Sequence, residues 1–376
     1  MTKILIVGMT ENPGGMESFV LNYLNQMDQT NLHFDFLSNT LKDIAYEEIF
    51  KKMGATMYHI PSFSKSPIQN KIQLHNFFKE HAYKYDGIWV HLNSLANIDY
   101  LKLAKQYNIP TRIVHSHNSE HMENGIKGNL KKINHVINKK ILKNYATEFW
   151  ACSNVAANFF FEDNIRNKVE IIPNAINVSL SEFNIECRKN IRHLNRISAE
   201  TFVLGNVGRL QYQKNQEFML EVFKVLHKIE KNSKLIFVGD GPDREYLQQK
   251  VKEYELVDSV IFAGLQSNIP EWLSAFDVFF FPSRFEGLSI AALEAQANGL
   301  PVITSTGVTK EIDITNLTTF IDLEAPISVW VDTLLSYKDS QSRQNKDVIL
   351  DKFIDKHFEI VRESERLRDL LVKGNR

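Results

Sequence analysis

The stretch Phe281-Pro-Ser-Arg-Phe-Glu-Gly-Leu-Ser-Ile-Ala-Ala-Leu-Glu-Ala-Gln-Ala-Asn-Gly-Leu-Pro301 carries the densest signal in the sequence. It is typical of a short apolar strand, a glycine-containing turn and an alanine-rich helix that Gly299 closes. Parallel sheets bind ligands beyond the carboxyl ends of their strands, and a helix that begins near Ser289 would direct free backbone N–H groups to that place. We therefore expect an anion such as a diphosphate to bind at this turn.

Outward from this stretch, short apolar runs alternate with helical patterns, which predicts an α/β fold with parallel sheets covered on both faces. The expected strands of the first half are Lys3–Val7, Phe34–Leu37, Thr56–Ile60, Gly87–Val90, Thr111–His115, Glu148–Ala151 and Val169–Ile172. Those of the second half are Phe202–Val207, Leu235–Val238, Ser259–Phe262, Val278–Phe281 and Pro301–Thr304. Two successive domains follow, with the polar stretch Val178–Ala199 as the expected linker. The helical pattern Lys352–Lys373 could pack on either domain.

Composition narrows the function classes. The chain has 376 residues, long enough for two α/β domains. Its 44 Lys and Arg nearly balance its 45 Asp and Glu, which argues against a dedicated nucleic-acid binder. Two cysteines without CxxC spacing suggest neither a disulfide framework nor a zinc site. The N-terminal run resembles a buried strand rather than a signal peptide, and no run is long enough for a membrane span, so we expect a cytoplasmic protein.

Two carboxylates stand out in the opening stretch. Glu286 lies just before the helix and Glu294 lies on it, with seven residues between them. Carboxylates accept paired hydrogen bonds from vicinal hydroxyls, so a sugar and a ribose are natural partners. Taken alone, the two would more often be a helix cap and a solvated side chain. The surrounding motif favours the binding interpretation.

A second group of residues follows the first strand of the second half. Arg209 and Lys214 lie on the loop beyond that strand, in the segment Gly205–Asn215. When a nucleotide diphosphate leaves a sugar, fixed cations stabilise the charge that develops, and no metal ion is needed. A pair of ordinary surface cations is the alternative.

Two glycine turns are weaker signals. Phe237–Asp243 runs from a strand into a helix, with Asp240 or Asp243 as a cap, and lacks the dinucleotide-binding GxGxxG pattern. In Asn12-Pro-Gly-Gly-Met-Glu, Gly14 and Gly15 start a helix where a phosphate or sugar could approach the backbone. A simple tight turn is an equally good interpretation of the second segment.

Two histidines end a strand of the first half. His115 and His117 share one face of that strand by the period of two. Histidines in such positions are usually core or surface residues, although His-x-His is also a pattern of metal ligands. His91 and His121 are the plausible additional ligands, and we expect no metal site.

Together these residues resemble the retaining GT-B enzymes of glycosyltransferase family 4, and more closely its bacterial exopolysaccharide and capsule glycosyltransferases. The resemblance runs from the first strand to about Ser305. Its strongest part is the Glu-x7-Glu motif from Glu286 to Glu294. Four further segments support it: VGRL…KN at 207–215, FVGDGP at 237–242, IIPNAIN at 171–177 and PGGME at 13–17. Ala175 and Ser305-Thr-Gly307 stand where many relatives have glycines.

The resemblance implies the GT-B fold, two Rossmann-like domains facing across a cleft. Residues 1–178 would bind the acceptor, residues 200–354 would bind the donor, and the C-terminal helix of about 355–376 would return to the first domain. It also implies a hexosyltransferase that moves a sugar from a nucleotide diphosphate donor, UDP by preference, to a saccharide or lipid-linked saccharide in cell-surface polysaccharide synthesis. Neither a metal ion nor another cofactor is expected.

The resemblance further assigns roles to matching positions. Arg209 and Lys214 would clamp the diphosphate, Glu286 would hold the hydroxyls of the donor sugar, and Glu294 would hold the ribose. His117 would lie near the reacting carbon. The remaining expected donor-binding positions are Gly14, Gly15, His115, Gly208, Asp240, Gly241, Gly264, Phe285, Gly287, Leu288 and Ser289. Because no nucleophilic carboxylate can be picked out, we hypothesise a front-face displacement in which the leaving phosphate helps to deprotonate the acceptor.

The stretch Lys127–Tyr145 predicts a basic amphipathic helix. Its lysines are 127, 131, 132, 139, 140 and 143, its apolar residues are Leu130, Ile133, Ile137 and Ile141, and it has no acidic residue. Such a helix could rest on anionic lipid at the inner face of the plasma membrane. A solvated lysine face over a buried apolar stripe is the equally weighted alternative.

Two further function classes stay open. A catalytically silent GT-B subunit could bind a partner enzyme, but it would have no need for the charges of Arg209, Lys214, Glu286 and Glu294. A nucleotide-sugar epimerase would instead release free sugar without an acceptor. A phosphorylase is disfavoured by length and by the lack of an evident pyridoxal lysine signature.

Overall fold

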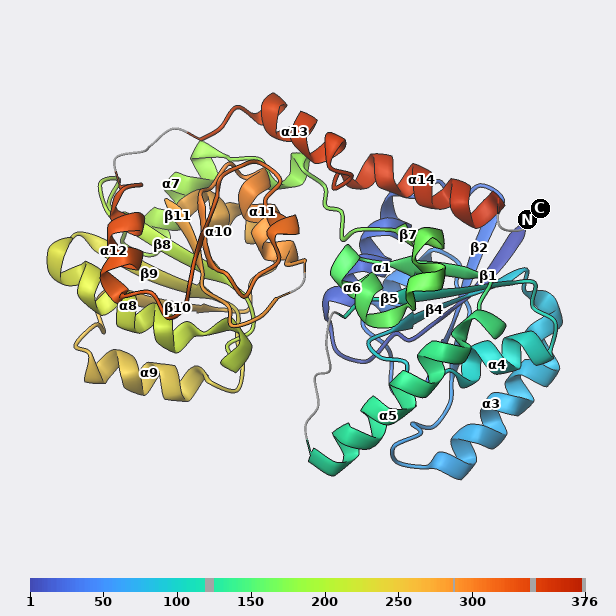
Figure 1. Ribbon diagram of the computed structural model, residues 1–376. Helices are drawn as coiled ribbons and strands as arrows, with labels where there is room; N and C mark the ends of the chain where they lie inside the picture. Colours follow the sequence, from blue (N-terminus) through green and yellow to red (C-terminus); the bar gives the residue numbers. More distant parts are fainter. Residues whose placement is uncertain (119–124, 287, 339–342, 374–376) are drawn as a thin grey trace. The chain divides into compact units, whose positions relative to one another are not determined.

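The computed structural model describes residues 1–118, 125–286, 288–338 and 343–373, and it divides into two compact units (Figure 1). Unit 1 comprises Met1–Ala175 and Ile360–Arg376, and unit 2 comprises Ile176–Glu359. Both units are α/β, as the strand and helix pattern predicted.

Unit 1 has a seven-stranded parallel sheet in the order β3-β2-β1-β4-β5-β6-β7. Its strands are β1 (Thr2–Val7), β2 (Leu32–Ser38), β3 (Met57–His59), β4 (Gly87–Leu92), β5 (Thr111–Ser116), β6 (Glu148–Ala151) and β7 (Val169–Ile171). Its α-helices are α1 (Gly15–Gln26), α2 (Glu47–Lys52), α3 (Pro67–His81), α4 (Asp99–Gln106), α5 (Gly125–Ile141), α6 (Asn154–Phe160) and α14 (Ile360–Lys373). The strand order reverses between β1 and β4, which is the position where open parallel sheets usually bind ligands.

Unit 2 repeats this arrangement with six parallel strands in the order β10-β9-β8-β11-β12-β13. Its strands are β8 (Phe202–Val207), β9 (Ser233–Val238), β10 (Val260–Gly264), β11 (Val278–Phe281), β12 (Val302–Ser305) and β13 (Thr318–Ile321). Its α-helices are α7 (Ile185–Leu194), α8 (Gln216–Ile229), α9 (Arg244–Glu253), α10 (Ile269–Ala275), α11 (Ile290–Ala297), α12 (Ile327–Leu335) and α13 (Lys346–Asp355). The equivalent reversal lies between β8 and β11.

Helices cover both faces of each sheet, because the strands are apolar on both sides. In unit 1, one apolar cluster contains side chains of α3, α4 and α6, and the other contains side chains of α1 and α14. In unit 2, α8, α9 and α12 contribute to one cluster, and α10, α11 and α13 to the other. A methyl group at Gly205 would lie 1.9 Å from Phe276 Cδ2, so this strand needs glycine for close packing.

One sequence-based expectation was wrong, and one strand was missed. The polar stretch Val178–Ala199 is no open linker, because it contains α7, which belongs to unit 2 and packs against α10. The C-terminal helical pattern is interrupted: α13 ends at Asp355 in unit 2, and α14, which lies within the expected C-terminal helix of about 355–376, starts at Ile360 in unit 1 and packs against α1. The strand β13 was not expected. Among the described residues, no helix is long and apolar enough to cross a bilayer.

Candidate active site

An ion pair lies at the carboxyl edge of the unit 2 sheet. Lys214 ends a short 3-10 helix (Tyr212–Lys214) after β8, and its Nζ atom lies 2.6 Å from Glu286 Oε2, in the loop after β11. Each side chain is 14% exposed. Gln213 Nε2 donates to the other carboxylate oxygen at 3.3 Å, and the Lys214 ammonium lies 4.9 Å from the centre of the Phe281 ring. The pair is therefore partly buried and held from several sides.

Backbone contacts fix the two loops that carry this ion pair. The Arg284 N–H donates to the Gln213 carbonyl at 2.8 Å, and Asn215 Nδ2 donates to the Pro282 carbonyl at 3.1 Å. Asn215 has a φ of 60°, a conformation that asparagine tolerates better than most residues. The Glu286 N–H donates to the Gly307 carbonyl at 3.3 Å, which adds the loop after β12. Three loops thus converge on the pair.

The Arg209 side chain is exposed in the loop after β8. It makes no hydrogen bond or ion pair with the part of the chain that the structure describes, whereas its carbonyl accepts from Gln216 Nε2 at 3.1 Å. We expected Arg209 and Lys214 to face one anion together. Within unit 2, Lys214 is instead paired with Glu286, and the Arg209 guanidinium has no counter-ion among the described residues.

Glu294 lies on α11 with its carboxyl group among protein atoms, although the side chain keeps some exposed surface. Burial raises the pKa of this carboxyl group to about 7. No described residue donates a hydrogen bond to its carboxylate that would offset the cost of ionising it. This is the state expected of a carboxylate whose hydrogen-bond donors come from a ligand.

The other expected donor-binding positions of unit 2 surround the same edge. Asp240 and Gly241 follow β9, where the Gly241 N–H donates to Asp240 Oδ1 at 2.8 Å. The turn also has a packing reason for glycine, since a methyl group at Gly241 would lie 2.2 Å from the Leu210 carbonyl oxygen. The remaining positions lie at the ends of β8 and β10, in the loop after β11 and at the start of α11: Gly208, Gly264, Phe285, Leu288 and Ser289. Gly287 lies outside the described residues.

A cluster of three histidines lies at the carboxyl edge of the unit 1 sheet. His91 on β4 pairs in register with His115 on β5, and His117 follows one residue beyond that strand. The rings of His115 and His117 stack with centroids 4.4 Å apart, and Phe19 of α1 meets both rings edge-on. His115 has no exposed surface and His117 has some, so of the two only His117 can meet a ligand directly.

Hydrogen bonds join these histidines to each other and to a tryptophan. His91 Nδ1 and His117 Nε2 lie 2.8 Å apart, and Trp89 Nε1 donates to His115 Nδ1 at 3.3 Å. Burial lowers the pKa of all three imidazoles, that of His117 to about 3. The rings are therefore neutral at physiological pH. One nitrogen of each ring lies within 4.8 Å of the others, so the cluster also has the spacing of a metal site.

Gly14 and Gly15 occupy the start of α1, after β1. Gly14 is the residue before the helix, and its backbone is extended. A methyl group at Gly15 would meet nothing within 4 Å. Packing within unit 1 therefore does not demand glycine at position 15, which fits a backbone that a ligand approaches.

The sequence interpretation missed Gln213 and gave His91 too small a role. Gln213 bonds both the Glu286 carboxylate and the Phe285 carbonyl, but a polar residue in a loop has no distinguishing pattern. His91 directly follows the expected strand Gly87–Val90 and His115 ends the expected strand Thr111–His115, but only the sheet shows that the two residues are paired in register. His91 was considered only as a metal ligand.

The fold and this edge geometry define the class. Two parallel α/β units, with a charged pair beyond β8 and β11 of the second, are the architecture of GT-B glycosyltransferases. Two solved structures with this fold are Anabaena Alr3699/HepE in complex with UDP, with a TM-score of 0.79 at 16% identity over 99% of this chain and 100% of that one, and WaaG, a glycosyltransferase involved in lipopolysaccharide biosynthesis, with a TM-score of 0.69 at 15% identity over 98% and 99%.

The sequence comparisons give the family. Residues 13–180 match Glycosyltransferase Family 4, and residues 188–315 match Glycosyl transferases group 1. The "Putative glycosyltransferase EpsF" of Bacillus subtilis (strain 168) is 31% identical over 338 residues, which cover 88% of this chain and 86% of the relative. An Escherichia coli relative, "UDP-Gal:alpha-D-GlcNAc-diphosphoundecaprenol alpha-1,3-galactosyltransferase", is 32% identical over 54% of each chain. The chain belongs to the group 1 glycosyltransferases of family 4, and it is a glycosyltransferase.

Proposed function

We propose that this enzyme transfers a hexosyl group from a UDP-sugar, with retention of anomeric configuration, to a saccharide or lipid-linked saccharide in cell-surface polysaccharide synthesis. The observation that carries the donor assignment is the edge of unit 2, where the Lys214–Glu286 pair, the exposed Arg209 and the start of α11 converge. The HepE structures that contain UDP and UDP-glucose support the choice of nucleotide. The name of the Escherichia coli relative supports a lipid-linked acceptor.

In this proposal, donor binding separates the Lys214–Glu286 ion pair, and each of the two side chains binds a part of the donor instead. The diphosphate binds Arg209, Lys214 and the N-terminal N–H groups of α11, since anions bind well at helix starts. Glu286, released from Lys214, accepts hydrogen bonds from the hydroxyls of the sugar. Glu294 accepts hydrogen bonds from the ribose hydroxyls, which stabilise its ionised form.

The proposed chemistry breaks the bond between the anomeric carbon and the β-phosphate oxygen and forms a bond from the same face to the acceptor oxygen. The acceptor proton moves to the leaving diphosphate oxygen, which acts as the base. Arg209 and Lys214 stabilise the negative charge on the leaving diphosphate, as fixed cations in a partly buried site can. His117, kept neutral by burial, would lie near the reacting carbon and offer a hydrogen bond rather than a charge.

We further propose that this chemistry is metal-independent. Two of the three lone pairs in the histidine cluster are engaged: the hydrogen bond between His91 and His117 uses one, and His115 Nδ1 accepts from Trp89, so the cluster offers a metal at most one free lone pair. A neutral imidazole that accepts at Nδ1 carries its proton on Nε2, so His115 has no free lone pair for a metal. Activity that survives chelation by EDTA is the expected outcome. Loss of activity that added Mn²⁺ or Zn²⁺ restores would contradict the proposal.

The decisive experiment incubates the purified enzyme with a panel of UDP-sugars, with and without acceptors, and determines the anomeric configuration of the product. A retained configuration is expected, and an inverted centre would refute the front-face displacement. Free sugar isomer formed without an acceptor would point to an epimerase. No nucleotide-sugar binding at all would point to a silent partner subunit.

A second part of the proposal concerns the membrane and rests on α5. The buried side of this helix carries polar residues: Leu95 donates its N–H to His135 Nδ1 at 3.1 Å, and Asn138 Nδ2 donates to the Leu95 carbonyl at 2.7 Å. Its exposed side carries four apolar residues between 53% and 59% exposed: Leu130, Ile133, Val136 and Ile137. The alternative of a solvated lysine face over a buried apolar stripe therefore does not describe α5, because its apolar residues are exposed and its polar residues are buried.

Exposed lysines accompany these apolar side chains, among them Lys131 and Lys140. Apolar residues beside lysines suit the interface of an anionic bilayer, where a lipid-linked acceptor would lie. Lys127, part of the predicted helix, has a side chain outside the described residues. We propose that α5 docks on anionic lipid, which would place the enzyme peripherally on the inner face of the plasma membrane.

Sedimentation with liposomes of phosphatidylglycerol and phosphatidylcholine tests the docking. We expect Ile133→Ser with Ile137→Ser, and separately Lys131→Glu with Lys140→Glu, to reduce the bound fraction. Lys228→Glu, at an exposed position of α8, is the matched control. Equal sedimentation of all variants would remove the membrane assignment and leave the donor assignment untouched.

A further inference from the structure

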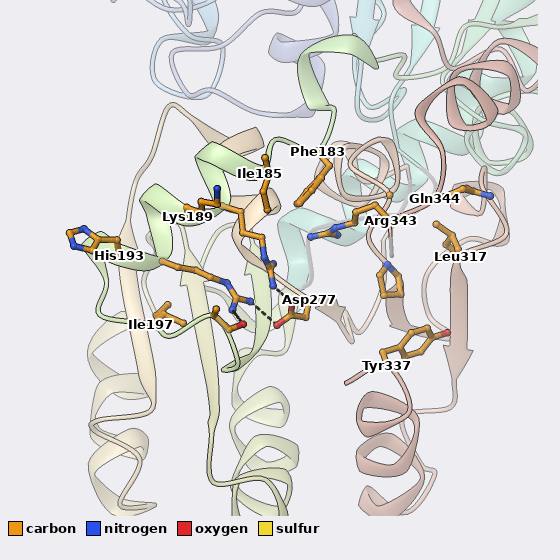
Figure 2. Close-up of a pocket in the computed structure, with 15 residues that line it drawn as sticks. Phe183, Ile185, Lys189, His193, Ile197, Asp277, Leu317, Tyr337, Arg343 and Gln344 are labelled. Atoms are coloured by element: carbon orange, nitrogen blue, oxygen red, sulfur yellow. Dashed lines mark hydrogen bonds and ion pairs between the residues drawn. The ribbon is translucent and has the colours of Figure 1, made fainter. Parts of the chain in front are cut away.

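Unit 2 contains a cavity of about 550 Å³, whose lining residues Figure 2 draws as sticks. Its lining includes Asp277, Pro301 and Leu317, which immediately precede β11, β12 and β13. These positions mark the amino edge of the sheet, whereas Lys214 and Glu286 follow the carboxyl ends of β8 and β11. A ligand in this cavity would thus be separate from the donor.

The lining of this cavity is strongly basic. It contains four basic side chains, Arg188, Lys189, Arg192 and Arg343, and one carboxylate, Asp277. Figure 2 shows two of the arginines directed at Asp277, whose Oδ1 accepts from Arg188 Nη2 at 2.6 Å and whose Oδ2 accepts from Arg192 Nη2 at 2.8 Å. Both oxygens of this carboxylate are therefore engaged, Lys189 pairs with Glu186 Oε1 at 2.8 Å outside the lining, and Arg343 forms no ion pair with the described residues.

Two of the arginines have a structural explanation. Arg188 Nη1 donates to the carbonyls of Ser274, Ala275 and Phe276 at 2.9 to 3.2 Å, at the end of α10. Arg192 makes similar bonds to carbonyls before β8, among them that of Thr201 at 3.0 Å. Carbonyls at a helix end attract cations, so both side chains serve the fold.

Arg343 is only partly explained in this way. Its Nη2 donates to the carbonyls of Phe276 at 2.6 Å and Leu273 at 3.5 Å, at the same end of α10, and its guanidinium lies 5.0 Å from the Phe183 ring. Its Nη1 is buried and has no hydrogen-bond partner in the described part of the chain. Burial lowers the pKa of Arg343 to about 9, and Arg188 contributes to this shift through repulsion. A buried guanidinium without a counter-ion is costly, and an anion in the cavity would supply one.

The rest of the lining sets the size and chemistry of that anion. Ile185, Leu317 and Tyr337 provide apolar walls, and the volume falls in the range of small-molecule sites, roughly 300 to 1,000 Å³. We propose that this cavity binds a small phosphorylated metabolite. Its phosphate group faces Arg343 and Lys189, and its carbon skeleton packs against the apolar walls. The proposal does not depend on the identity of the donor sugar.

The test is isothermal titration calorimetry of the full chain with inorganic phosphate and with fructose 6-phosphate. Saturable binding is expected, tighter for the sugar phosphate because it also fills the apolar walls. Arg343→Gln should weaken binding at least ~10-fold, as loss of a charge-assisted hydrogen bond does. Lys228→Ala, an exposed lysine that does not line the cavity, should bind like the wild type.

Two further variants keep the result decisive. Lys214→Ala weakens phosphate binding at the candidate donor site, so binding that persists in Lys214→Ala and disappears in Arg343→Gln belongs to this cavity. Should Arg343→Gln not fold, Lys189→Glu decides instead, because this side chain is 66% exposed and its ion pair with Glu186 is a surface contact. Unchanged affinity in Lys189→Glu, absence of saturable binding, or binding lost in Lys214→Ala alone would overturn the proposal.

Discussion

Glu294 gives the sharpest test of the donor site, because its protonation must respond to the ligand. Burial raises the pKa of the free carboxyl group to about 7 from its usual value of 4.5. Ribose hydroxyls donate to the ionised form, so binding should return the pKa toward its usual value. The affinity for UDP-glucose should therefore fall about 10-fold, or ~1.4 kcal/mol, between pH 8 and pH 6. Close to one proton should be released per ligand bound at pH 6.

Calorimetry in two buffers of different ionisation enthalpy measures both quantities. UDP-glucose suits the experiment better than UDP, since the sugar blocks the phosphate group that would titrate in this range. Glu294→Gln should bind weakly, release no proton and show no dependence on pH between 6 and 8. A wild-type affinity that is flat over this range, or a Glu294→Gln variant with the same slope as the wild type, would refute the reasoning.

The same pKa shift predicts that Glu294 lowers the free energy of unfolding as the pH rises, whereas most carboxylates raise it. A carboxyl group whose folded pKa is raised favours the folded state below its unfolded pKa, and this contribution is lost as the pH rises through 7. At pH 8 the ionised Glu294 should cost about 3 kcal/mol by linkage. Glu294→Gln should then raise the free energy of unfolding at pH 8 by ~1–3 kcal/mol and change it little at pH 4. Urea denaturation at the two pH values measures this difference.

Four further substitutions test other parts of the structure. Lys214→Ala should lower kcat ~10²-fold or more in a UDP-release assay by removing a charge-stabilising group, with Lys228→Ala as the unaffected control; a loss within a few fold would contradict its role. Gly205→Ala should lower the free energy of unfolding by ~1–3 kcal/mol in urea denaturation, because the added methyl group collides with Phe276. Gly15→Ala, where a methyl group meets nothing, should keep wild-type stability and lose affinity for UDP-glucose, and unchanged affinity would remove Gly15 from the site. Arg192→Met should destabilise by ~1–3 kcal/mol in the same denaturation assay, since several buried carbonyls, among them those of Ala275 and Thr201, lose their donor while Asp277 keeps its ion pair with Arg188; an unchanged free energy of unfolding would contradict that role.

The sequence predicted most strands of the two sheets because these strands are continuous apolar runs. The prediction of elements failed where polar residues stabilise the fold. The helix α7 looks like a linker because Arg188 and Arg192 are charged, yet both bond to Asp277 and to carbonyls of unit 2. The strand β13 was overlooked because Thr318-Thr-Phe-Ile321 is half polar and lies at the edge of its sheet.

The sequence predicted which loops carry the candidate site, but it did not predict which side chains contact one another there. The motifs placed Lys214 and Glu286 in the loops after two strands. Their ion pair depends on the adjacency of β8 and β11, which are separated in sequence by β9 and β10. The burial that shifts the pKa of Glu294 likewise depends on packing around α11. On α5, helical periodicity correctly gave an amphipathic helix, but it could not tell that His135 and Asn138 face inward and the apolar residues outward.

The route of the chain through the two units has a consequence for the order in which they fold. The chain enters unit 2 at Ile176 and leaves it after Glu359, and these two residues form a parallel bridge, with the Ile176 N–H donating to the Phe358 carbonyl at 3.0 Å. Unit 2 is thus inserted into unit 1, and the two ends of the insertion lie side by side. During synthesis the segment 176–359 is complete before α14, the last helix of unit 1, has been made. We therefore expect this segment to fold independently, before unit 1 is complete.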